Sequence, residues 1–422
     1  MSVEKQAARI LQEMQKNAVG RRGFMRGTGI AAMGVAAPSL LAACGTKPAV
    51  QNAGPTTSAT AGATGSASAT STEPACVSTD ISSTDPRLNF SNWPAYIDKS
   101  HGTRPTLDAF EKQTGIQVTY TQDINDNQEF FNTVQAQLSS CQPTGRDLIV
   151  MTDWMAAKMV GLGWIQTLDH SAIPNVDNNM LTNLKNPAWD PNRDHSAPWQ
   201  SGVTGLAYNS KYTGEVKSFQ ELLTRSDLKG KVSLLTEMHD TMGFMVKAVG
   251  GDPSNFSETD WQNAIDFMQK AVSDGQIRRF TGNDYINPLN DGNIVACEAW
   301  SGDVIQMQYD NPDIKWVVPE EGLSLWSDNM LVPNKADHKA NAEALMNYYY
   351  DPQVAAQLAA WVNYICPVEG AQDAMKKIDK LLVDNPLIFP TADFMANTWA
   401  FMPLDAATET KYQTDFTNAQ IG

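Results

Sequence analysis

The segment Arg146-Asp147-Leu148-Ile149-Val150-Met151-Thr152-Asp153-Trp154 decides the expected fold, because a short apolar run here ends abruptly in polar and aromatic residues. The run predicts a strand over residues 147–151. Upstream of it we expect a strand over 88–93, a helix over 106–114, a strand over 116–121 and a helix over 127–138. Strand, helix, strand, helix, strand is typical of a parallel sheet with right-handed crossovers, so the sequence predicts an α/β fold.

Aromatic and polar residues directly follow two of these strands. Trp93 and Tyr96 come after the first strand, and Thr152 and Trp154 come after the third. In parallel α/β sheets, ligands bind beyond the carboxyl ends of the strands. These four residues are therefore candidate ligand-binding residues.

A second α/β set is expected after a crossing segment at residues 198–208, which contains Gly202, Gly205 and other small residues. The predicted elements are helix 219–223, strand 232–235, helix 242–249, helix 258–273, strand 294–300, a helix over 340–350, another helix ending near 362, and a largely helical remainder to residue 422.

The turn over residues 236–241 carries two carboxylates, Glu237 and Asp240. They are three residues apart at an expected helix start, so they would face the same side. Such a pair could face a ligand. Carboxylates at a helix start are also favoured by the exposed amides and the helix dipole, so plain N-capping is the alternative.

Two further short segments each pair an indole with a carboxylate. Glu298-Ala299-Trp300-Ser301-Gly302-Asp303 is followed, one strand and turn later, by Leu325-Trp326-Ser327-Asp328. Carboxylates accept charge-assisted hydrogen bonds from ammonium groups, and an indole face attracts a cation. On turn-bounded segments this combination suits an organic cation, and the alternative is core tryptophans with turn-capping aspartates.

Length and charge narrow the class of protein. At 422 residues the chain is too long for one ordinary core, so two domains are expected. The net charge of the whole chain is −16. Residues 1–43 carry six Lys or Arg and two Asp or Glu, a net charge of +4, so the remaining residues carry a net charge of −20. Because phosphate contacts need clustered Lys and Arg, nucleic-acid binding is not expected, and the acidic balance suits a cationic ligand.

The N-terminus predicts export. Arg21-Arg22-Gly23-Phe24-Met25-Arg26 resembles a twin-arginine motif, and the apolar run over residues 27–43 is too short to span a membrane. Leu41-Ala42-Ala43-Cys44 resembles a bacterial lipobox, so residues 1–43 are expected as a signal peptide and Cys44 as the lipidated first residue. The Ser-, Thr-, Ala- and Gly-rich residues 44–84 are expected to form a disordered tether.

With these residues assembled, the chain from Leu88 onward resembles the bacterial spermidine/putrescine-binding proteins, the extracellular receptors of polyamine ABC importers. Five strings in family order carry the resemblance: Phe90-Ser91-Asn92-Trp93-Pro94-Ala95-Tyr96, Arg146-Asp147-Leu148-Ile149-Val150, Ala299-Trp300-Ser301-Gly302-Asp303, Leu325-Trp326-Ser327-Asp328 and Asn363-Tyr364-Ile365-Cys366-Pro367.

The resemblance implies a monomeric receptor that captures putrescine, spermidine or spermine and delivers it to an ABC permease, with no cofactor and no metal. It implies a periplasmic-binding-protein-like α/β fold, in which two lobes with mixed, mainly parallel sheets enclose a ligand cleft. Lobe 1 would take residues 85–203 and 329–375, and lobe 2 residues 204–328 and 376–422. The implied ligand-binding residues are Trp93, Tyr96, Thr152, Trp154, Glu237, Asp240, Trp300, Asp303, Trp326, Asp328 and Tyr364.

The chain also departs from the family pattern. A polar residue expected after Trp399 is Ala400, which removes one expected contact to a terminal amine. Asp303 follows the putrescine-type branch, whereas the remaining aromatics fit either branch. The length of the ligand is therefore left open.

Four cysteines remain if Cys44 is lipidated, and they allow three disulfide connectivities. None has the paired spacing of a zinc site. We favour Cys76 with Cys141, because both lie near the same end of one predicted sheet, and Cys297 with Cys366, because they flank Trp300 and Tyr364.

Other functions remain as alternatives. An enzyme is not expected, because the sequence has neither a Gly-x-Ser-x-Gly elbow nor a His-Glu-x-x-His pair. A receptor for a metal ion, an amino acid or another organic cation is the main rival. Ferric-ion receptors use neighbouring tyrosines, which the run over residues 348–350 would supply, although a helix points successive side chains in different directions. A lipoprotein that senses a solute without a transporter would have the same sequence.

Overall fold

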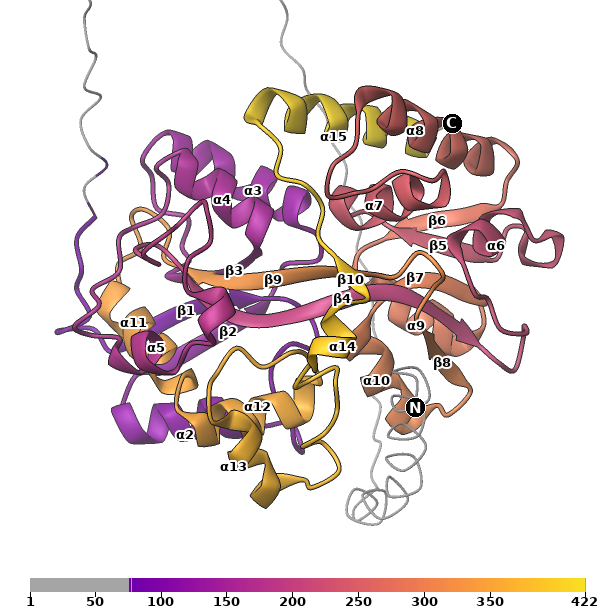
Figure 1. Cartoon of the computed structure of the whole chain (residues 1–422). Coiled ribbons are helices and arrows are strands. Elements are labelled where there is room, and N and C mark those ends of the chain that lie inside the picture. The colour runs from indigo at the N-terminus through magenta and orange to yellow at the C-terminus, as the bar shows by residue number, and fades with distance from the viewer. Residues whose placement is uncertain (1–75, 77, 422) are drawn as a thin grey trace, which may run out of the picture.

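The computed structural model describes residues 76 and 78–421 (Figure 1). The twin-arginine motif, Cys44 and residues 45–75 of the expected tether lie outside the described residues.

The first half of the chain forms the parallel sheet that its apolar runs predicted. The middle strand of this group pairs in parallel with its two neighbours, in the order β2-β1-β3. Glycine ends the first helix, because Gly115 adopts φ 78°, and Asp126 begins the next helix by accepting the Glu129 N–H. The elements are β1 (Arg87–Asn92), α2 (Pro105–Thr114), β2 (Gln117–Gln122), α3 (Asn127–Ser139), β3 (Leu148–Thr152) and α4 (Asp153–Gly161).

Two long antiparallel strands, β4 (Ala197–Asn209) and β9 (Leu323–Leu331), join the two lobes into one continuous sheet. The main path of this sheet is β2-β1-β3-β9-β4-β7-β5-β6. Figure 1 shows β4 and β9 running from one lobe into the other. The crossing segment expected at residues 198–208 is therefore confirmed, and the expected lobe boundaries at residues 203 and 329 fall inside these strands.

The second lobe repeats the parallel arrangement, because β5 pairs in parallel with both β6 and β7. The helices of this lobe differ from expectation in three places: residues 286–291 and 301–310 form helices that were not predicted, and one predicted helix begins early. Helix α7 begins at Met238, four residues earlier than predicted, so Asp240 lies in its first turn rather than in a loop before it. The elements are α6 (Phe219–Thr224), β5 (Val232–Leu235), α7 (Met238–Ala248), α8 (Glu258–Ser273), β6 (Ile277–Thr281), α9 (Ile286–Asp291), β7 (Ala296–Trp300), α10 (Ser301–Asp310) and β8 (Ile314–Val317).

The C-terminal part is less helical than predicted. Residues 379–391 and 400–405 form no helix, and they contain Pro386, Pro390 and Pro403, which lack the amide that a helix interior needs. The elements are α11 (Lys339–Tyr349), α12 (Pro352–Val362), α13 (Ala371–Ile378), α14 (Ala392–Met395), β10 (Thr398–Trp399) and α15 (Ala406–Ile421), and α5 (Pro174–Asn179) and the 3-10 turns Thr182–Leu184, Ser226–Leu228 and Asn283–Tyr285 complete the structure.

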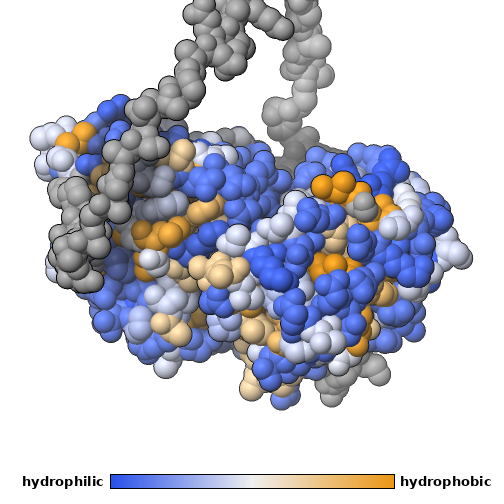
Figure 2. Space-filling model, turned by 90° about the horizontal axis from the view of Figure 1, so that it is seen from above, coloured by the Kyte–Doolittle hydropathy of each residue, from blue (hydrophilic) through white to orange (hydrophobic). Residues whose placement is uncertain are grey.

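Two clusters of buried side chains form the core of the described residues. The larger surrounds β1, β3, α11 and α12, and the smaller packs α6, α7, α8 and α15 against the second lobe's strands. Hydrophilic residues dominate the face seen from above, and hydrophobic groups occur there as separate patches (Figure 2). Among the described residues, no helix combines the length and apolar character needed to cross a membrane.

The predicted disulfide between Cys76 and Cys141 is confirmed. The two Cα atoms lie 5.6 Å apart, within the usual range for a disulfide. The bond attaches the segment before β1 to the end of α3.

The predicted pairing of Cys297 with Cys366 is wrong, because both are buried free cysteines. Cys297 pairs with Ala207 on β4, whereas Ile365, next to Cys366, bridges Ser201 on the same strand. Six residues along a strand span about 20 Å. A disulfide spans less than about 7 Å between Cα atoms, so the two cannot meet.

Residues 78–84, which were expected in the tether, pack on lobe 1 instead. The backbone N–H of Ala340 donates to Asp80 Oδ2 (3.2 Å), and that of Asn341 donates to Ser82 Oγ (3.2 Å). These amides belong to the first turn of α11, where backbone donors have no partner within the helix. The expected boundary of the tether at residue 84 is therefore too late.

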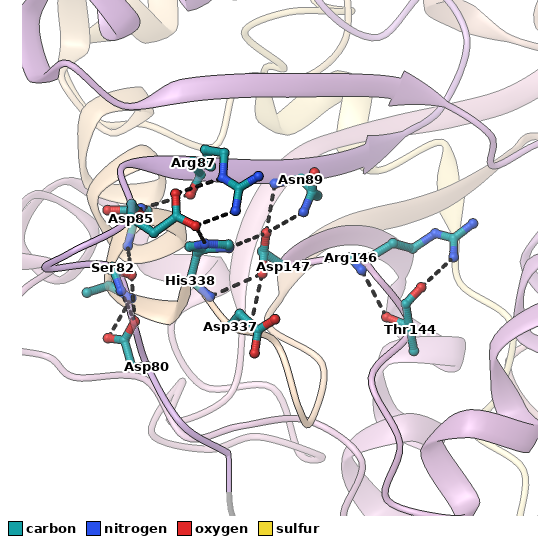
Figure 3. A network of polar contacts seen from close by, with 12 residues as sticks. Asp80, Ser82, Asp85, Arg87, Asn89, Thr144, Arg146, Asp147, Asp337 and His338 are labelled. Atoms are coloured by element: carbon teal, nitrogen blue, oxygen red, sulfur yellow. Dashed lines mark hydrogen bonds and ion pairs between the residues drawn. The ribbon is translucent and has the colours of Figure 1, made fainter.

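A buried carboxylate explains the Arg146-Asp147-Leu148 string that contributed to the resemblance. Asp147 accepts hydrogen bonds from the backbone N–H groups of Asn89, Asp337 and His338 and contacts the His338 ring at 3.0 Å (Figure 3). It thereby ties β1, the start of β3 and the loop before α11 together. This residue is structural, and it does not line the cavity described next.

Candidate binding site between the lobes

A cavity of about 140 Å³ lies at the carboxyl ends of the strands, where the α/β topology placed the expected site. It is many times larger than the space that one water molecule needs. The structure brings all eleven sequence-predicted residues to its wall: Trp93, Tyr96, Thr152, Trp154, Glu237, Asp240, Trp300, Asp303, Trp326, Asp328 and Tyr364.

Aromatic rings make the apolar part of the wall. Trp93 and Trp300 meet edge to face with ring centroids 5.9 Å apart, and Trp326 and Tyr364 lie 5.6 Å apart. The indole N–H of Trp93 donates to the Val150 carbonyl (3.0 Å), which fixes the orientation of its ring. Trp93 and Trp300 therefore belong to the buried core cluster and also line the cavity.

Two glycines make room for these rings. A Cβ atom added at Gly302 would lie 2.3 Å from the Tyr364 ring, and one added at Gly202 would lie 2.4 Å from the Trp326 ring. Both distances are far below van der Waals contact, and in each case the obstructing atoms belong to a ring that lines the cavity. The small residues of the crossing strand therefore have a specific role in shaping the site.

Asp303 lies in the first turn of α10, and three donors hold its carboxylate. The hydroxyl of Tyr364 donates to Oδ1 (2.9 Å), and Asn283 Nδ2 (2.8 Å) and the Tyr285 hydroxyl (2.9 Å) donate to Oδ2. Burial raises the pKa of Asp303 to about 6. The other side-chain atom of Asn283, Oδ1, is buried and has no hydrogen-bond partner among the described residues.

Asp328 lies inside strand β9 and is held on both oxygens. Thr152 Oγ1 donates to Oδ1 (2.7 Å), and the Tyr96 hydroxyl donates to Oδ2 (2.7 Å). Burial raises the pKa of Asp328 to about 7. The interpretation of Asp303 and Asp328 as turn caps is wrong, since one points from a helix into the cavity and the other lies in a strand interior.

Glu237 and Asp240 complete the set of four sequence-predicted carboxylates. Glu237 Oε1 accepts from the backbone N–H (2.7 Å) and the side-chain amide (2.9 Å) of Asn127, across the gap between the lobes. Asp240 Oδ2 accepts from the indole N–H of Trp300 (3.1 Å). Burial raises the pKa of both carboxyls, for Glu237 well above its usual range. The alternative of N-capping is wrong for Glu237, which occupies the N-cap position of α7 without a capping hydrogen bond, and Asp240 lies in the first turn of the helix.

A stack of three rings lies at one edge of the cavity. The His239 ring lies between Trp154 (centroids 4.7 Å apart) and Phe401 (4.5 Å), and its Nε2 is 3.0 Å from the Glu409 carboxylate. Trp154 comes from lobe 1, whereas His239 and Glu409 come from lobe 2. The stack therefore spans the gap between the lobes.

Sequence reasoning missed several lining residues: Asn127, Asp153, His239, Asn283, Ser324 and Phe401. The signal for Asn283 was available, because it follows the carboxyl end of β6, but that strand was not predicted. Ala400 lines the cavity as expected and supplies no polar side-chain atom.

The charged side chains that line the cavity in the described part of the chain include carboxylates but no ammonium or guanidinium group. No lysine or arginine occurs among the described residues that line the cavity. The same residues contain no group of three or more His, Cys, Asp or Glu side chains that could hold a metal ion.

The alternative of a ferric-ion site at the tyrosine run over residues 348–350 is wrong, because the hydroxyls of this run bond to other parts of the fold. The Tyr349 hydroxyl contacts Thr106 Oγ1 (2.9 Å) and the Tyr350 hydroxyl donates to the Pro198 carbonyl (2.7 Å), and neither residue lines the cavity. These tyrosines pack helix α11 against its neighbours, as helical spacing indicated.

Comparison with known proteins agrees with this geometry. The sequence profile described as "Bacterial extracellular solute-binding protein" matches residues 106–390, more than half of the chain. Among curated relatives, the spermidine/putrescine-binding periplasmic protein 1 of Haemophilus influenzae is 26% identical over 293 residues, covering 69% of this chain and 79% of that protein. The putrescine-binding periplasmic protein PotF of Escherichia coli is 27% identical over 339 residues, covering 75% of this chain and 87% of PotF.

Solved structures share the fold. A putative spermidine/putrescine ABC transporter protein from Listeria monocytogenes superposes with a TM-score of 0.69 at 23% identity, covering 80% of this chain and 99% of that chain. The binding protein AgtB from A. tumefaciens R10, solved with agropinic acid, gives a TM-score of 0.62 at 18% identity, covering 80% of this chain and 99% of AgtB. The shared fold therefore accommodates different solutes.

The two-lobe α/β architecture and the family match also agree on a protein that binds its ligand without catalysis. The chain belongs to the bacterial extracellular solute-binding protein family, and it is an extracellular or periplasmic protein that binds a solute as the partner of an ABC transporter.

Proposed function

We propose that the solute is a polyamine, such as putrescine, spermidine or spermine, which the protein captures outside the cell and delivers to an ABC permease. One observation carries the proposal: four carboxylates lie at most 8% exposed around one aromatic cavity that has no lysine or arginine among its described lining residues. Burying ionised carboxylates without a positively charged partner is costly, so the cavity is suited to a ligand that brings positive charge.

The remaining features suit an ammonium with a hydrocarbon chain. An ammonium group has three donors, and Asn283 Oδ1 supplies a free acceptor next to Asp303. The faces of Trp93, Trp300 and Trp326 suit cationic heads and methylene groups. An anionic solute would be repelled by the same wall.

The relatives support the same class of ligand, because the names of both curated relatives above include putrescine. At 26% and 27% identity, however, the choice among putrescine, spermidine, spermine and another organic cation rests on the cavity itself. We propose a role in transport rather than in sensing because of the family match. A permease gene next to the gene for this protein would support transport.

Export and anchoring are proposed on the N-terminal motifs alone. The twin-arginine motif would direct export, and lipid on Cys44 would hold the receptor on the outer face of the cytoplasmic membrane. We expect the folded part to act as a monomer. Mass analysis of Cys44 in the membrane fraction tests the anchor.

Calorimetric titration tests the ligand. Putrescine, spermidine or spermine should give saturable binding in physiological salt, with no chemical change in the recovered ligand. An amino acid, a sugar and a metal ion serve as comparison solutes. Binding of one of these by a protein that ignores all three polyamines would overturn the proposal.

A further inference from the structure

A second hollow lies next to the cavity, because adjacent residues of three segments line the two. This groove, of about 450 Å³, is open to solvent and is formed by the start of α3, the ends of β5 and β6, and α15. Carboxylates from both lobes face it: Asp126 and Glu129 from lobe 1 and Asp284 from lobe 2. No lysine or arginine belongs to its described lining, and Lys158 contacts Gln128 at its rim (3.4 Å).

The groove also contains an unused polar group. Thr281 lines it and is 1% exposed, and its hydroxyl oxygen has no hydrogen-bond partner among the described residues. A buried polar atom without a partner costs free energy, which a donor or acceptor from a ligand or ordered water would recover. The acidic lining and this free hydroxyl together indicate a site for a cationic donor.

The wall between cavity and groove is one residue thick. Three short segments each give one residue to the cavity and the adjacent residue to the groove. These neighbours are Asn127 and Asp126, Glu237 and Thr236, and Asn283 and Gly282.

Residues from both lobes form this wall, and non-covalent contacts hold it together. It is closed by the hydrogen bonds of Asn127, from lobe 1, to Glu237, from lobe 2. A slightly wider angle between the lobes would separate these two residues and connect the hollows. A chain passing through would meet Glu237 first, and then Asp126 and Asp284.

We propose that the groove is a second ammonium subsite, which holds the far end of a triamine or tetraamine whose first ammonium groups occupy the cavity. This inference rests on the proposed polyamine function and extends it to the choice of ligand length. It assigns the diamine to the cavity alone. It also assigns the groove carboxylates a role that is specific to longer polyamines.

The test compares putrescine with spermine on the full chain by calorimetric titration. The double variant Asp126→Asn and Asp284→Asn removes both charges, and the amide introduced at position 126 keeps an acceptor oxygen for the Glu129 N–H at the start of α3. Asp351→Asn, at the start of α12, is the matched control because it also removes an N-cap charge outside the groove. The single variant Asp284→Asn, at an exposed position, serves if the double variant does not fold.

The double variant should weaken spermine binding by about tenfold, the loss expected when charge-assisted contacts to Asp126, which is 7% exposed, and to the exposed Asp284 are removed, and should leave putrescine binding within about twofold of the parent. Equal effects on both ligands, no effect on either, or two spermine molecules per chain would each overturn the subsite while leaving the polyamine function intact. A parent protein that binds neither ligand would overturn the proposed function, and the subsite with it.

Discussion

Acidification should weaken polyamine binding steeply, because two carboxyls that line the cavity titrate near neutral pH. Burial raises the pKa of Asp328 to about 7 and that of Asp303 to about 6. A bound ammonium favours the ionised forms, so a proton on either carboxyl competes with the ligand. Ammonium groups, with ordinary pKa values of about 10, keep their charge throughout this range.

The size of the effect follows from these two values. The fraction of free protein with both carboxyls ionised falls from roughly three quarters at about pH 7.5 to under roughly one hundredth at about pH 5.5. The affinity should therefore fall about 100-fold, or about 2.7 kcal/mol. At about pH 6, binding should release roughly 1.4 protons per complex.

Stability should respond with the matching sign. A raised carboxyl pKa means that the folded, ligand-free protein binds more protons than the unfolded chain between about pH 4 and pH 7. The contribution of these two groups to the free energy of unfolding is therefore largest at the acidic end and is lost as the pH rises. A bound polyamine offsets this loss, so its effect on the melting temperature should be larger at about pH 7.5 than at about pH 5.5.

Titration calorimetry in buffers of different ionisation enthalpy measures both the affinity and the released protons. Asp328→Asn removes the group with the higher pKa and should flatten the upper part of the pH profile. Asp351→Asn should leave the profile unchanged. An affinity that varies less than about threefold over the range, with no proton release, would show that these carboxyls do not hold the cation.

Three further perturbations address the site and its closure. Asp303→Asn should weaken polyamine binding by about 2–5 kcal/mol in a protein that stays folded, whereas Trp326→Phe should cost about 1–2 kcal/mol; equal, small losses would contradict a charge contact. Gly302→Ala should reduce both affinity and thermal stability, because its Cβ meets the Tyr364 ring at 2.3 Å, whereas Gly161→Ala, with open space at that position, is the control. Solution scattering should show a smaller radius of gyration with ligand than without, and an unchanged profile at saturation would mean that the lobes do not close on it.

The parts of the fold that were predictable are those with strong local signals. Strands β1 and β3 are short runs with buried apolar residues, and helix α2 ends at a glycine in the left-handed region. The start of α7 was missed, because no side chain caps it and its first turn is held by packing of Met238 instead. The short strands β8 and β10 have too few residues to show a period of two.

The candidate site shows a similar division. The predicted tryptophans and carboxylates are conspicuous in the sequence, and the structure brings these residues to one cavity. Asn127 is not conspicuous, because an amide carries no charge and fits any loop, and Asn283 was missed because strand β6 before it was not predicted. The Cys297 pairing failed for a different reason: which residues meet across strands depends on register, and local sequence does not reveal that.

Strand β9 has a mechanical consequence of its own. Trp326 and Asp328, which face the cavity, lie in the same nine-residue strand that connects the two lobes. No other element separates these cavity-lining residues from the strand that joins the lobes. If the lobes close as predicted, β9 both contacts the solute and bends, so we expect substitutions in β9 to change ligand affinity and lobe closure together.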